Sequence, residues 1–83
     1  MNYDVLIERN VLKEIKKFPA HDVNRIKNVL RKLPAFPVGM DVKKIVGTKN
    51  IYRVRVGNYR ILIELEIHTL KVFSVIQRKS AYK

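Results

Sequence analysis

The spacing of apolar residues changes once along this chain, and that change most constrains the fold. After a short opening strand, apolar side chains recur every three or four residues up to about residue 33, which predicts helices. From residue 51 onwards they alternate with polar side chains, which predicts strands. The chain has 83 residues, the size of one domain. We therefore expect a single α+β domain over residues 1–83.

The first half of the chain predicts one strand and a pair of helices. Residues 2–8 alternate in polarity and are interpreted as a short edge strand. Asn10 is the expected N-cap of a helix that Pro19 ends. A second helix is expected over residues 20–33, with its apolar side chains in one stripe. Together these helices form a hairpin with one apolar side.

The second half predicts an antiparallel meander of three strands. Residues 51–56 and 59–67 flank Gly57 and Asn58, a pair typical of a two-residue hairpin turn. The last strand covers residues 70–77. We expect the helices to cover one face of the sheet, because neither layer can bury its apolar side alone. The opposite face, called here the open face, is then free for solvent or a partner.

Between the helices and the meander, residues 34–50 are expected to form a loop with a short strand near residues 43–46. On the last strand, we expect Phe73 and Val75 on the core side and Val72 on the open face, because side chains alternate along a strand.

Four arginines are predicted to converge on the open face. Arg53 and Arg55 point away from the core, and the tight turn places Arg55 diagonally near Arg60. Arg78 follows the last strand on the same side. Clustered guanidiniums repel one another unless an anion lies among them, and arginine suits bidentate phosphate binding. The alternative is an ordinary solvated surface in which Glu64 and Glu66 pair with them, but two acids do not neutralise four bases.

The charge of the whole chain points to a polyanionic partner. Eighteen Lys and Arg face seven Asp and Glu, a formal net charge of +11. The chain has no cysteine, and His21 and His68 lack a partner at ligand spacing, so we expect neither metal nor cofactor. No signal peptide and no membrane-length apolar run are visible, so we expect a cytoplasmic protein with no membrane contact.

Two segments carry a resemblance to a known family. The run IYRVRVGNYRILI at residues 51–63 is similar to the central hairpin of RelE-type toxins, and VIQRKSAY at residues 75–82 is similar to their closing segment. With the element order, the whole chain resembles the RelE/ParE toxin superfamily, most closely archaeal-type RelE mRNA interferases. That resemblance implies a ribosome-dependent endoribonuclease that cuts translated mRNA in the A site and inhibits translation.

The resemblance also implies roles for individual residues. Arg60 matches the arginine that grips the phosphate, Arg78 an arginine of transition-state stabilisation or leaving-group protonation, and Tyr82 a tyrosine that stacks on a base or orients the attack. Arg53 and Arg55 match two basic positions that bind RNA phosphate. The basic tail residues expected to bind RNA with them are Lys79 and Lys83. Arginine hardly deprotonates in a protein, so this set leaves the general base unassigned.

The partners implied are a cognate RelB-like antitoxin, the ribosome and mRNA. Toxin and antitoxin would form a hetero-oligomer able to bind operator DNA through the antitoxin. Two other hypotheses remain open on the same fold: a ParE-like inhibitor of DNA gyrase, and a non-catalytic nucleic-acid-binding protein. Arg78 together with Tyr82 favours the nuclease, because a pure binding module needs neither beside the strand arginines.

Overall fold

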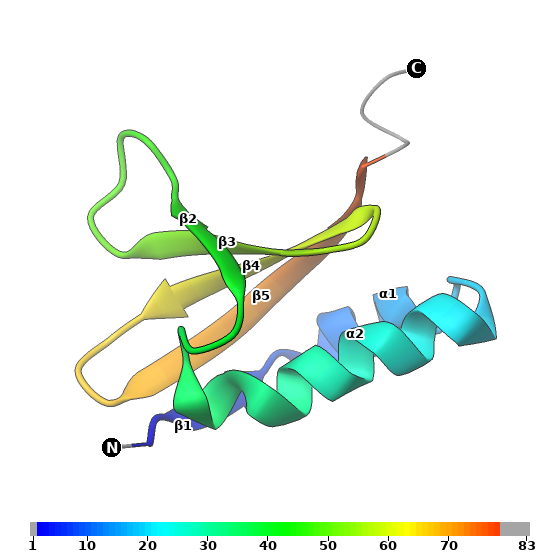
Figure 1. The fold of residues 1–83 in the computed structure, drawn as a ribbon, viewed down its shortest axis with the longest axis horizontal. Coiled ribbons are helices and arrows are strands. Elements are labelled where there is room, and N and C mark those ends of the chain that lie inside the picture. Colours follow the sequence, from blue (N-terminus) through cyan, green and yellow to red (C-terminus); the bar gives the residue numbers. More distant parts are fainter. Residues whose placement is uncertain (1, 79–83) are drawn as a thin grey trace.

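The structure is a computed structural model and describes residues 2–78. In chain order these residues form β1 (Asp4–Ile7), α1 (Arg9–Ile15), α2 (Ala20–Lys32), the 3-10 helix η1 (Leu33–Ala35), β2 (Asp41–Lys44), β3 (Ile51–Val56), β4 (Tyr59–Leu65) and β5 (Thr69–Gln77). Both helices lie on one face of the sheet (Figure 1), so the predicted α+β arrangement is confirmed. No helix within the described range is long and apolar enough to cross a membrane.

The sheet contains five strands in the order β1-β5-β4-β3-β2. The predicted meander of β3, β4 and β5 forms its centre, and β2 adds to β3 in antiparallel fashion. β1 pairs in parallel with β5, from Asp4 opposite Thr69 to Ile7 opposite Val72. A parallel pair needs a long crossover connection. The α1–α2 hairpin provides the first part of it, and this is why the helices cover one face.

The two helices begin and end where backbone geometry and proline allow. α1 starts at Arg9 with Glu8 as N-cap, so the expected cap at Asn10 is wrong. The Glu8 amide donates a hydrogen bond to the Val72 carbonyl at 3.0 Å, so the chain leaves the sheet there and turns at once into the helix. α1 ends at Ile15, before it reaches the Pro19 that was expected to end it, and Pro19 stands at the N-cap of α2.

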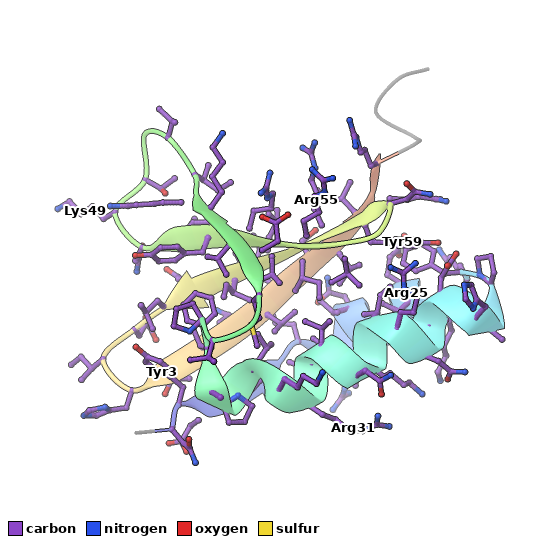
Figure 2. All side chains as sticks on the ribbon, viewed as in Figure 1. Tyr3, Arg25, Arg31, Lys49, Arg55 and Tyr59 are labelled. Carbon is purple, nitrogen blue, oxygen red and sulfur yellow. The ribbon has the colours of Figure 1, made fainter. Side chains whose placement is uncertain are left out.

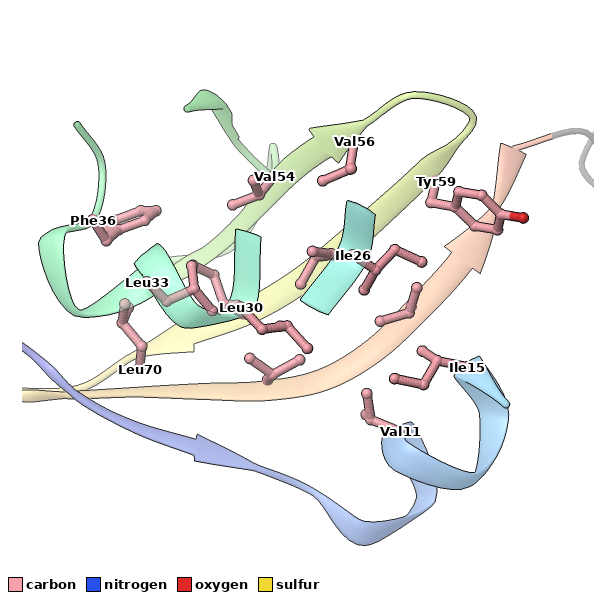
Figure 3. Packing of buried hydrophobic residues seen from close by; sticks show 14 residues of the cluster. Val11, Ile15, Ile26, Leu30, Leu33, Phe36, Val54, Val56, Tyr59 and Leu70 are labelled. Carbon is pink, nitrogen blue, oxygen red and sulfur yellow. The ribbon is translucent and has the colours of Figure 1, made fainter. Parts of the chain in front are cut away.

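The core lies between the helices and the covered face of the sheet (Figure 3). Val11 and Ile15 from α1 meet Ile26 and Leu30 from α2 above the central strands. The buried apolar residues of the sheet are Val54, Val56, Tyr59, Ile61, Ile63, Leu70, Val72 and Val75. Alternation on β3 and β4 therefore leaves the arginines of these strands on the open face.

A β-bulge in β5 changes which side chains face the core. Leu62 pairs with Ser74 and Ile63 with Val72, which leaves Phe73 as the extra residue. Val72 is completely buried, whereas Phe73 is only partly buried and lies outside the core cluster. The expected placement of Val72 on the open face and Phe73 in the core is therefore wrong. An extra residue shifts the alternation by one position, and the sequence pattern gave no sign of it.

Candidate functional site

The sheet register places an acid, two arginines and an isoleucine in one row across the open face. Asp41 on β2 is paired with Arg55 on β3, Arg55 with Arg60 on β4, and Arg60 with Ile76 on β5. Arg55 is thus directly opposite Arg60 and not diagonal to it, which corrects the expectation from the turn. Figure 2 shows Arg55 on the side of the sheet away from the helices.

The Asp41 carboxylate forms ion pairs with two of the predicted arginines. Its Oδ1 lies 3.4 Å from Nη2 of Arg53 and its Oδ2 lies 3.8 Å from Nε of Arg55. The Arg53 side chain is only 17% exposed, whereas that of Arg55 is 49% exposed. Sequence reasoning had offered Glu64 and Glu66 as the pairing acids and missed Asp41. Asp41 follows a loop that has no strand periodicity of its own, so its register with β3 could not be anticipated.

The guanidinium groups of this face retain hydrogen-bond donors that the protein does not satisfy. Among the described residues, Nε of Arg53 and Nε of Arg60 are buried without a hydrogen-bond partner. A buried donor without an acceptor costs free energy. An anion with several acceptor oxygens would let the arginines reorient and satisfy these donors. The arrangement is therefore suited to binding a phosphate group.

Arg78 is anchored beside the β3–β4 turn. Its backbone amide donates a hydrogen bond to the Asn58 carbonyl at 2.6 Å, which continues the pairing of β5 past Gln77. Its side chain is half-buried. Arg78 therefore joins the end of the sheet that carries Arg55 and Arg60. Three of the sequence-predicted residues lie outside the described residues: Lys79, Tyr82 and Lys83.

A buried tyrosine ties the β3–β4 turn to α2. The Tyr59 hydroxyl donates a 2.7 Å hydrogen bond to Oδ2 of Asp22, and its ring packs on Phe18 with centroids 4.6 Å apart. Burial, together with the hydrogen bond to Asp22, raises the pKa of Tyr59 to about 12. The hydroxyl therefore stays protonated and acts as a fixed donor. Sequence reasoning identified Tyr59 as a core residue but missed its partner.

Another arginine, Arg25 of α2, lies against the same turn on the side that faces the helices. A Cβ built on Gly57 would lie 2.9 Å from Nη1 of Arg25, so the guanidinium of Arg25 rests against the turn (Figure 2). A cavity of about 220 Å³ opens nearby, and its lining includes Arg25, Asp41, Arg55 and Gly57. Within residues 2–78 no cluster of three or more His, Cys, Asp or Glu could hold a metal ion.

Several known proteins are similar to this chain, although no model of a protein family matches it. A protein named Toxin RelE3 from Methanocaldococcus jannaschii is 39% identical over 82 residues, covering 94% of this chain and 93% of that protein. A RelB–RelE antitoxin–toxin complex from Methanococcus jannaschii contains a chain with TM-score 0.80 and 38% identity, covering 93% of this chain and 94% of that one.

A further solved structure, the archaeal RelE–RelB complex from Pyrococcus horikoshii, is similar at TM-score 0.79 and 28% identity, over 94% of this chain and 97% of that one. These matches extend over nearly the full length of each protein. They therefore include the helices, the sheet and the strands that carry the arginines.

Proposed function

This chain belongs to the RelE toxin family, and from that premise we propose that it is the toxin of a type II toxin–antitoxin pair and acts as a ribosome-dependent mRNA endoribonuclease. Its substrate is the mRNA in the A site of a translating ribosome. The 2′-hydroxyl of the message attacks the adjacent phosphorus, which leaves a 2′,3′-cyclic phosphate and a 5′-hydroxyl end. The protein acts in the cytoplasm, where messages are translated.

The observation that carries this proposal is the pair of opposed arginines, Arg55 and Arg60, with Arg53 beside them. Each guanidinium presents a planar fork of N–H donors that matches two phosphate oxygens. Negative charge builds up on the phosphoryl oxygens during in-line attack. Donors already in place stabilise that charge more than they stabilise the ground state, and one such donor is typically worth about 3 kcal/mol.

Arg78 and Tyr82 have proposed roles that follow from family membership. Arg78 stabilises the transition state or the leaving oxygen from the end of β5, close to the turn that carries Asn58. Tyr82 stacks on a base of the message, because an ordinary tyrosine hydroxyl, with a pKa of about 10, is a poor base at neutral pH. Lys79 and Lys83 contribute further phosphate contacts.

The proposed inhibitor is a RelB-like antitoxin of acidic character. The similar chains from both archaea were solved as complexes of RelE with RelB. The net charge of +11 favours an acidic partner. Such a segment would cover the open face or the helices, where Leu12 and Ile76 are both 43% exposed. Binding only the folded state would stabilise it by about 4 kcal/mol at a thousandfold excess over Kd.

The test of the nuclease is primer extension on a translated message, with and without ribosomes. We expect cleavage by the wild type only with ribosomes. Arg78→Ala should lose roughly a hundred- to a thousandfold in rate, because a preorganised charge is removed. Lys16→Ala, a charge change at an exposed position at the end of α1, should keep nearly full activity.

A second variant separates the two roles of Tyr82. If the ring stacks on a base, Tyr82→Phe keeps most of the activity, since stacking needs only the aromatic face. If the hydroxyl moves a proton, activity collapses. Absence of cleavage by the wild type, or equal cleavage by wild type and Arg78→Ala, would contradict the nuclease. The first of these outcomes would leave a gyrase inhibitor or a non-catalytic binding protein on the same fold.

A further inference from the structure

The proposed cleavage needs a group that accepts the proton of the 2′-hydroxyl, and arginine does not provide one. Three acids lie on open-face positions of the described strands: Asp4, Asp41 and Glu64. Asp4 is paired with Thr69 on the edge strand β1, at the opposite edge of the sheet from β2 and away from the arginine pair. Glu64 is paired with Ile51 and Lys71, toward the far end of the sheet from the arginine pair. Asp41 is in the same row as Arg55 and Arg60. Asp41 is therefore the carboxylate next to the phosphate-binding arginines.

The geometry of Asp41 suits a base that is held in place and still reachable. Its two carboxylate oxygens lie 3.4 Å from Arg53 Nη2 and 3.8 Å from Arg55 Nε. The carboxylate side chain nevertheless remains 59% exposed. The cavity of about 220 Å³ that borders Asp41 and Arg55 opens toward α2, since Arg25, Val29 and Val54 also line it, so the access of a ribose from the open face rests on the exposure of the carboxylate. A phosphate gripped by Arg55 and Arg60 would bring its neighbouring ribose to this edge.

We propose that Asp41 is the general base of the cleavage reaction, an inference that rests on the proposed nuclease function. The Asp41 carboxylate takes the 2′-hydroxyl proton while the 2′-oxygen forms a bond to phosphorus. The bond between phosphorus and the 5′-oxygen breaks, and the 5′-oxygen leaves with the electron pair and takes a proton from water. Asp41 then returns its proton to the hydroxide so formed. The cleavage reaction written in this way needs no oxidant, metal or other co-reactant.

With Asp41 as the base, the arginines need only bind the phosphoryl oxygens and orient the carboxylate. Arg55 and Arg60 neutralise the phosphoryl oxygens, and Arg53 keeps Asp41 oriented through the 3.4 Å contact. A carboxylate oxygen can accept a proton, which a guanidinium cannot do. A positioned base of this kind is typically worth about a hundred- to ten-thousandfold in rate.

The experiment compares Asp41→Asn with Glu64→Gln, which removes the same charge from the same sheet face. Single-turnover cleavage is measured on saturating programmed ribosomes, with the affinity for those ribosomes measured separately. Asp41→Asn should lose roughly a hundredfold or more in cleavage rate. Its ribosome affinity should stay equal or rise, because an acid has left a basic surface. Glu64→Gln should cleave at the wild-type rate, and Asp41→Glu should recover much of the loss.

The pH profile distinguishes a base from a residue that only orients the arginines. Between about pH 6 and 9 the wild-type rate should depend little on the hydroxide concentration, because a protein group takes the proton. The Asp41→Asn rate should rise about tenfold per pH unit, because hydroxide must then remove the proton. The amide keeps an oxygen that can accept from Arg53, and melting temperatures verify that the variant folds.

Two results would overturn the role of Asp41: wild-type cleavage by Asp41→Asn, or parallel pH profiles for the two proteins. A wild type that never cleaves would instead overturn the proposed function itself. The two failures are therefore told apart by the wild-type lane of the same assay.

Discussion

Arg55 and Arg60 are direct cross-strand partners, so two positive charges face each other on adjacent strands. Like charges in this position destabilise a sheet, and an anion between them reverses the effect. We expect inorganic phosphate to raise the melting temperature of the wild type. At ten times its Kd the stabilisation is about 1.4 kcal/mol.

Arg60→Gln should lose most of that increase. The matched control is Arg31→Gln, because Arg31 is an exposed arginine of α2 whose Nη1 donates to Asn28 at 2.8 Å. Its phosphate response should equal that of the wild type, with sodium chloride used to match ionic strength. An equal response of Arg60→Gln would show that phosphate acts elsewhere on the surface.

The bond between Tyr59 and Asp22 predicts a loss of stability in alkali. Burial and this bond raise the pKa of Tyr59 to about 12, whereas an unfolded tyrosine titrates near about 10. The folded state holds the proton more tightly, so the contribution is complete below about pH 10 and is lost as pH rises through about 12.

Urea unfolding of wild type and Tyr59→Phe should therefore differ by about 1–3 kcal/mol at neutral pH, and the difference should shrink toward zero near about pH 12. Comparing the two proteins cancels the titration of the lysines. Asp22→Asn should cost less than Tyr59→Phe at neutral pH, because the amide oxygen still accepts the hydrogen bond. A difference that stays constant with pH would rule out the linkage.

The contact between Gly57 and Arg25 predicts two separable costs for Gly57→Ala. The first is backbone strain at a φ of +56°, and the second is the clash of the new Cβ with a guanidinium atom 2.9 Å away. Gly39→Ala is the matched control, because its φ is +71° and nothing lies within 4 Å of its Cβ position. It should lose about 1 kcal/mol.

Gly57→Ala should lower the free energy of unfolding in urea by more than Gly39→Ala does. Adding Arg25→Ala to Gly57→Ala should reduce its loss to that of Gly39→Ala. A side-chain tip can move, so the extra cost is expected to be on the order of 0.5–1 kcal/mol. Equal losses in the two single variants would mean that Arg25 does not rest on the turn in solution.

The bulge in β5 predicts an order of stabilities opposite to that expected from simple alternation. Val72 is completely buried, so Val72→Ala should cost about 2 kcal/mol. Phe73, the larger side chain, lies outside the core cluster, so Phe73→Ala should cost less than a core phenylalanine, which is worth about 3–5 kcal/mol. Thermal unfolding of both variants measures this. A full core-sized loss for Phe73→Ala with a small loss for Val72→Ala would refute the register.

Local sequence patterns predicted much of this fold, because turns and strand alternation depend on only a few neighbouring residues. The turn at Gly57 and Asn58 fixes the β3–β4 register, and so it also predicts that Arg55 and Arg60 are neighbours. Alternation then assigns both to one face. Pro19 likewise lies between the two helices, at the N-cap of α2.

The features that could not be predicted depend on contacts between distant segments. Asp41 reaches Arg53 and Arg55 only because β2 adds to β3 in one register. The Asp22 carboxylate meets Tyr59 only after α2 packs on the sheet. The bulge at Phe73 is a property of the pairing between β4 and β5, and nothing in the β5 sequence alone marks it.

The parallel pairing of β1 with β5 has a consequence for the order of folding. It joins residues near the two ends of the chain, and β5 is also the neighbour of β4. The sheet therefore cannot close until the last strand has been synthesised, and closing so long a loop slows folding. The arginine row gains its final neighbour, Ile76, only at that stage. A chain still being translated thus lacks the finished open face until β5 has been synthesised.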